Sequence, residues 1–94
     1  MTDRPATPDE LRMEAHAVLE RLRRLDAATR DGERLTVDSV DAVTGALARL
    51  QRRIEATARH YNHSWALRDV VAARRHLDEA RMVVLGLLSD LTSG

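Results

Sequence analysis

Apolar residues recur along three segments of the chain in alternating steps of three and four, the spacing of amphipathic helices. The first segment predicts a helix over 8–30 whose apolar positions are Leu11, Ala15, Val18, Leu22 and Leu25, with Leu19 widening the face. The second predicts a helix over 37–61 with Val40, Val43, Leu47, Leu50, Ile54 and Tyr61 on one side, and Thr57 or Ala58 filling the weak step. The third predicts a helix over 65–91 with Ala66, Val70, Ala73, Leu77, Ala80, Val84, Leu87 and Leu91 facing one way.

The residues between these segments predict where the helices begin and end. Residues 7–10, Thr-Pro-Asp-Glu, form a capping box with proline at the first helical position. Gly32 can adopt the left-handed conformation that ends a helix, and Thr36 suits the N-cap of the next one. Continuing the second register past Tyr61 would place Ser64 on the apolar side, so we expect a break near 61. One continuous helix through this region is the alternative, because no Gly or Pro interrupts it.

Together these segments predict an all-α protein, an antiparallel three-helix bundle in which short connections join neighbouring helices. We expect one helical domain over 7–91, a flexible N-terminal tail over 1–6 and a C-terminal tail over 92–94. The alanines at 66, 73 and 80 of the third helix would let a neighbouring helix approach closely. Trp65 lies off that apolar side, at a place where it could close the end of the bundle.

Residues 82–88, Met-Val-Val-Leu-Gly-Leu-Leu, are apolar without a break. At about 100° per residue, seven consecutive positions cover the whole circumference of a helix, so this part of the third helix has no polar side. A small bundle covers only one or two sides of its own helix, which predicts oligomerisation through the third helix or attachment to another chain. The expected partner-interface residues are Met82, Val83, Leu85, Gly86 and Leu88. Burial of this helix within a single chain is the alternative.

Composition and charge narrow the class of function. The chain of 94 residues has no Cys, which excludes disulfides and thiolate metal sites, and Tyr61 and Trp65 are its only Tyr, Trp or Phe residues. Fifteen Arg and no Lys face fifteen acidic residues, so the formal net charge is zero. Such balance favours helix surfaces with internally paired charges and argues against nucleic acid as the main ligand. With a polar N-terminus and no apolar run long enough to span a bilayer, we expect a cytoplasmic protein without membrane contact.

Candidate residues for chemistry are few. His60 and His63 are three positions apart and could share a helix face, but no third clustered ligand accompanies them. The chain has no Glu-x-x-His pair and no glycine-rich phosphate loop. The sequence therefore predicts no catalytic residue, no metal site and no cofactor.

The function that these features favour is a small non-catalytic helical protein-protein interaction module. Its partner would be itself, in a homodimer, or a larger protein subunit to which it belongs as an obligate small subunit. The alternative is an accessory subunit that completes the active site of a larger enzyme of the secondary-metabolism type. In that case Arg74, His76 and Arg81, beside the interface, would border the shared site. A nucleic-acid-binding regulator is a third and less favoured interpretation.

Overall fold

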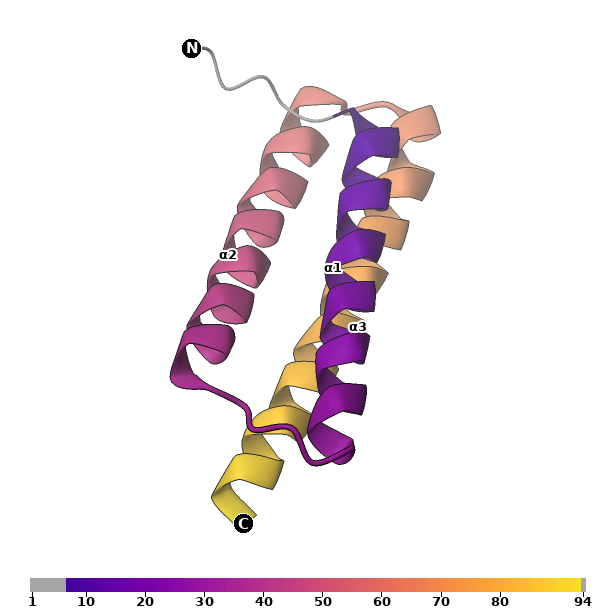
Figure 1. Cartoon of the computed structure of the whole chain (residues 1–94). Coiled ribbons are helices and arrows are strands. Elements are labelled where there is room, and N and C mark those ends of the chain that lie inside the picture. The colour runs from indigo at the N-terminus through magenta and orange to yellow at the C-terminus, as the bar shows by residue number, and fades with distance from the viewer. Residues whose placement is uncertain (1–6, 94) are drawn as a thin grey trace.

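A computed structural model describes residues 7–93 of the chain, with side chains as far as Ser89. It contains three helices, α1 (Pro8–Arg30), α2 (Val37–His60) and α3 (Ser64–Ser93), and no strand in the described range. The chain runs down α1, returns along α2 and runs down again along α3 (Figure 1). The all-α three-helix fold is thus confirmed, and the break at 61–63 excludes one continuous helix.

The helix bounds differ from the expected ones by at most two residues. α3 extends to Ser93, so it includes part of the segment expected to be a C-terminal tail. The tail expected over 1–6 lies outside the described residues, as does the side chain of Leu91.

The predicted N-cap residues form the hydrogen bonds expected of them. The Glu10 N–H donates to the Thr7 hydroxyl at 3.2 Å, and the Ser39 N–H donates to the Thr36 hydroxyl at 3.1 Å. Each hydroxyl satisfies one of the free N–H groups of the first turn. Gly32 has a φ of 100°, which a residue with a side chain rarely adopts, and it takes the chain out of α1.

The most extensive contact in the bundle is between α1 and α3. On α3, the alanines at 66, 73 and 80 are fully buried, and on α1 Ala15 is fully buried too. Residues with so little volume allow the two helix axes to lie close together. Two ion pairs at the surface also join α1 to α3. Arg12 lies 3.1 Å from Asp69, and Arg23 lies 3.0 Å from Glu79. Both are solvent-exposed and contribute little stability by themselves.

Packing against α3 changes which residues lie at the centre of the α1 face. Leu19, expected at its edge, is fully buried together with Leu11 and Leu22. Val18 and Leu25, expected at its centre, are only half-buried. The reason is that α1 turns toward α3, its main neighbour, and leaves the side that faces α2 partly open.

Of the three helices, α2 makes the least extensive contacts with its neighbours. Its buried residues are Leu47, Leu50, Ile54 and Thr57, so Thr57 fills the step that the apolar spacing left open. An ion pair of 2.7 Å between Arg53 and Glu14 joins α2 to α1.

Trp65 does not close the end of the bundle, because its side chain is 63 % exposed. Its ring lies instead beside those of Tyr61 and His63, with centroids 6.0 and 6.2 Å away. The end of the bundle therefore carries a small aromatic cluster on its surface rather than a buried tryptophan.

The alanine side of α3 should not accept larger residues. We expect Ala73→Leu to lower the free energy of unfolding by about 1–3 kcal/mol, because the added atoms force α1 and α3 apart. Urea unfolding followed by circular dichroism measures this change. Ala17→Leu, at an exposed position of α1, is the matched control and should change stability by less than about 0.5 kcal/mol. Equal tolerance of both substitutions would contradict the close approach.

Candidate protein-protein interface

Exposed apolar side chains are concentrated on one helix. Among the described residues, eight large apolar side chains are exposed, and six of them belong to α3. The other two are Met13 on α1 and Val37 at the start of α2. The six residues of α3 are Trp65, Leu67, Val71, Met82, Leu85 and Leu88. Isolated exposed apolar residues are common on soluble proteins, whereas a concentration on one element makes that element the candidate for an interface.

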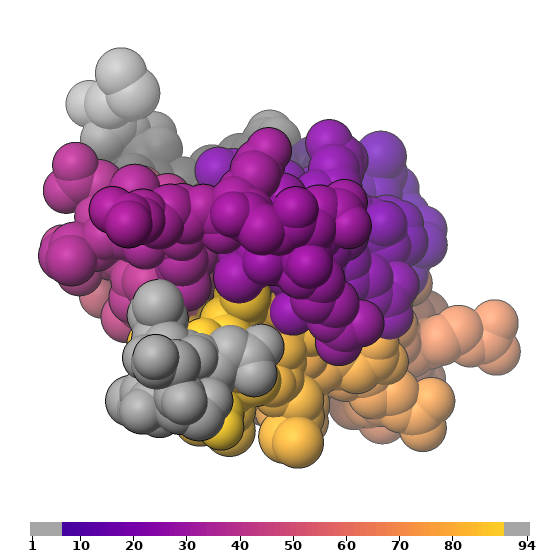
Figure 2. Space-filling view, turned by 60° about the horizontal axis from the view of Figure 1, so that its bottom comes forward, coloured from indigo at the N-terminus to yellow at the C-terminus, as the bar shows by residue number. Residues whose placement is uncertain are grey.

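Most of these side chains lie on the side of α3 that faces away from both other helices. The outer face, as we use the term, comprises residues 67, 68, 71, 74, 75, 78, 79, 82, 85 and 86. Arg74 and Asp78 lie at its edge next to α2, and Glu79 lies at its edge next to α1. It holds an N-terminal apolar patch, Leu67 and Val71, and a C-terminal apolar patch, Met82 and Leu85. Seen from the lower end of the molecule, the orange and yellow atoms of α3 form one edge of the surface (Figure 2). Neither α1 nor α2 covers that edge.

The expected interface residues do not all lie on this face. Met82 is 67 % exposed, Leu85 59 % and Leu88 39 %, and Gly86 is exposed as well. Val83 instead packs against the core of its own chain. At about 100° per residue, positions two apart lie on nearly opposite sides of a helix, so Val83 and Leu85 cannot share a surface. The C-terminal patch therefore consists of Met82 and Leu85 beside Gly86. Leu88, two positions from Gly86, lines an apolar hollow together with Leu25 and Val43 instead.

Charged residues separate the two apolar patches. Arg74 and Arg75 make no side-chain ion pair or hydrogen bond within the part of the chain that the structure describes. Asp78 is 3.7 Å from a guanidinium nitrogen of Arg81, at the edge of ion-pair distance. Glu79 accepts a hydrogen bond from Arg23 of α1 at 3.0 Å. The middle of the outer face thus presents two unpaired cations next to two carboxylates.

The three residues expected to border a shared active site are not brought together. Arg74 and Arg81 line a groove of about 190 Å³ between α2 and α3, where Arg81 also donates to the side chain of Gln51. His76 lies on the other side of α3, with its ring 5.4 Å from that of His16 on α1. Its Nδ1 atom is buried without a hydrogen-bond partner. The body of α3 therefore separates His76 from the two arginines.

The candidate metal ligands at the α2–α3 connection are exposed. The His60 ring contacts Tyr61 edge to face at a centroid distance of 4.8 Å, and the His63 ring stacks on Trp65. Within the described residues, no three His, Asp or Glu side chains are placed to hold a metal ion together. In the structure, both imidazole rings therefore contact aromatic rings.

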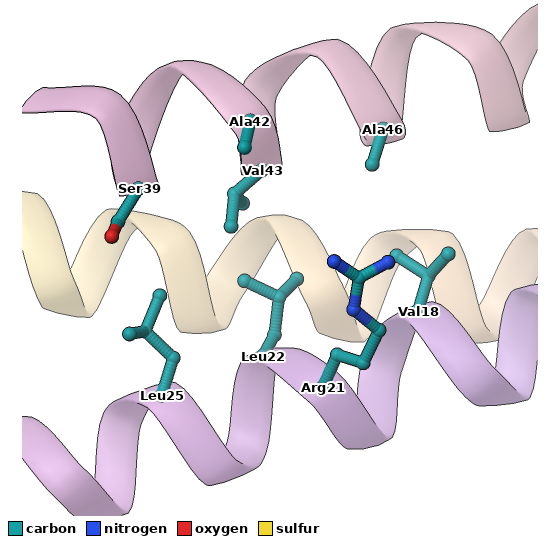
Figure 3. Close-up of a pocket in the computed structure, with 8 residues that line it drawn as sticks. All are labelled: Val18, Arg21, Leu22, Leu25, Ser39, Ala42, Val43 and Ala46. Carbon is teal, nitrogen blue, oxygen red and sulfur yellow. The ribbon is translucent and has the colours of Figure 1, made fainter.

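A groove between α1 and α2 is a feature that the sequence reasoning missed. It has a volume of about 240 Å³, and its walls are mostly apolar. In Figure 3, Val18, Leu22 and Leu25 of α1 point toward α2, where Ala42 and Ala46 present only methyl groups to the groove. The signal in the sequence was the pair of small residues beside Val43, on the flank of the α2 stripe. The groove shows how loosely α2 rests on α1.

Comparison with known proteins assigns no relative. The sequence matches no family model, and no curated protein or solved structure shows significant similarity to it. Across residues 7–93, no helix combines the length and hydropathy needed to cross a membrane. The function must therefore be argued from the surface chemistry of the chain.

The open surroundings of Gly86 have a measurable consequence. Apart from its chain neighbours and the adjacent backbone of its own helix, no atom of the chain lies within 4 Å of a Cβ built at Gly86, and the same is true of Gly45 on α2. We expect Gly86→Ala to raise the free energy of unfolding of the isolated chain by about 0.5–1 kcal/mol, because alanine favours the helix. Gly45→Ala is the matched control and should give the same gain. If urea unfolding shows a gain for Gly45→Ala alone, something packs against Gly86 in solution.

Proposed function

We propose that this chain is a small non-catalytic helical protein-protein interaction module that attaches through the outer face of α3. It acts either as a homodimer or as the small subunit of a larger complex. The observation that carries the proposal is the concentration of exposed apolar side chains on this one helix. No comparable group is exposed on the described parts of α1 or α2.

The energetics of the C-terminal patch support this role. Full burial of an exposed Leu or Met side chain contributes about 1.5–3 kcal/mol. Met82 and Leu85 are 67 % and 59 % exposed, so covering them removes a large part of two apolar side chains from water. Interfaces are also enriched in Met and Arg relative to the rest of a protein surface. The outer face offers both, with Arg74 and Arg75 beside the apolar patches.

The geometry of the bundle leaves this face available. The core side of α3 is occupied by its contacts with α1 and α2, as the burial of Ala73, Leu77 and Ala80 indicates. A partner can therefore bind the outer face without rearranging the fold. The backbone of this face is already helical in the free chain, so binding requires no folding of a loop or tail.

A charge placed in the C-terminal patch should prevent attachment and leave the fold intact. We expect Met82→Glu and Leu85→Glu to weaken association at least tenfold, because each would bury an unpaired carboxylate. The helical circular dichroism of the isolated chain should not change. Light scattering and native mass spectrometry of the purified protein, and of the complex isolated from its own host, measure the loss.

Met13→Glu is the matched control, since Met13 is 60 % exposed on α1, close to the 67 % of Met82. It should leave the assembly unchanged. A wild-type chain that is monomeric at high concentration and carries no stoichiometric partner when isolated from its host would overturn the proposal. Equal sensitivity to Met13→Glu and Met82→Glu would show that the outer face has no special part in binding.

A further inference from the structure

The order of apolar and charged groups on the outer face is self-complementary. Along α3 the N-terminal patch is followed by two arginines, then by two carboxylates, then by the C-terminal patch. We infer that the partner of this face is a second copy of the chain, with its α3 running in the opposite direction. This inference rests on the proposed function, because it names the occupant of the same surface.

The apolar patches fix the alignment of the two helices. With a two-fold axis crossing α3 between positions 76 and 77, Val71 lies opposite the partner's Met82, and Leu67 opposite the partner's Leu85. Each N-terminal patch then covers the C-terminal patch of the other copy. The contact extends from 67 to 85, about 27 Å at 1.5 Å per residue, so both exposed patches are covered at once.

The charges between the patches agree with this alignment. On the flank of α3 nearer to α2, Arg74 faces the partner's Asp78. On the flank nearer to α1, Arg75 faces the partner's Glu79, which already accepts a hydrogen bond from its own Arg23. The symmetry repeats each pair, so Arg74 and Arg75 of both copies gain a carboxylate.

A parallel pairing of the same faces would bring like charges together. Because opposite flanks then meet at equal height, Arg74 would lie beside the partner's Arg75, and Asp78 beside the partner's Glu79. Parallel helices would also align their dipoles unfavourably. In the opposite orientation Gly86 lies across from the partner's Arg68, where the absence of a side chain leaves room for the long guanidinium group.

Disulfide trapping between two single-cysteine variants tests the pairing, since the natural chain has no Cys. Val71→Cys and Met82→Cys, each at an exposed position, are purified with tags of different mass, mixed and oxidised. Opposed positions meet the separation of about 4.4–6.8 Å between Cα atoms that a disulfide needs. Identical positions are about 16 Å apart along the axis. The mixed disulfide should therefore dominate over both symmetric ones.

Met13→Cys, mixed with either variant, is the control for random collision and should give only the low yield of unassociated molecules. Dominant symmetric disulfides would show a parallel pairing and overturn the inference. A purified chain that stays monomeric and forms disulfides only at the control level would also overturn it. If such a monomer still binds a larger subunit that Met82→Glu releases, the proposed function stands and this inference alone fails.

Charge reversal at Arg74 and Asp78 is an independent test of the antiparallel pairing. Arg74→Asp places two carboxylates opposite each other and should weaken the dimer about tenfold, and Asp78→Arg should do the same with two cations. The double variant Arg74→Asp/Asp78→Arg restores opposite charges and should recover the dissociation constant measured by sedimentation equilibrium. A dimer strengthened by Arg74→Asp alone would contradict the opposed orientation.

Discussion

The close approach of α1 and α3 is the constraint on which the rest of the structure depends. Fully buried alanines at 66, 73 and 80 let the two helices pack tightly, and in doing so they determine which side of α3 is enclosed. Since that side of α3 packs against α1, α2 can contact only the flank of α3. The loose position of α2, with a groove of about 240 Å³ toward α1, follows from this arrangement.

The same constraint leaves an apolar surface of α3 exposed. A helix that is apolar all round over 82–88 must leave some apolar side chains exposed once its core side faces a bundle of only two neighbours. Val83 is drawn into the core, while Met82 and Leu85 remain in solvent. Farther along the same face, Leu67 and Val71 are exposed in the same way. A second helix laid along this face would complete the enclosure that the chain itself does not provide.

The sequence predicts a feature of this structure well when the residues that determine the feature are close together along the chain. The caps at Thr7 and Thr36 and the stop at Gly32 involve neighbours within three or four positions, and all were correct. The position of Trp65 was wrong, because whether an aromatic ring closes a bundle depends on how the other helix ends meet it. Leu19 was placed at an edge although it lies at the centre, because the apolar spacing does not say which helix α1 will face.

By itself the sequence determined three helices, their ends, and an apolar excess near the end of the third. These depend on periodicity and on local hydrogen bonds, which adjacent residues specify. Only the tertiary structure decided that Val83 packs against the core while Leu85 stays exposed, and that His76 faces α1 while Arg74 borders α2. The physical reason is that periodicity gives the angle between residues on a helix, whereas the neighbouring helices decide which angles are enclosed.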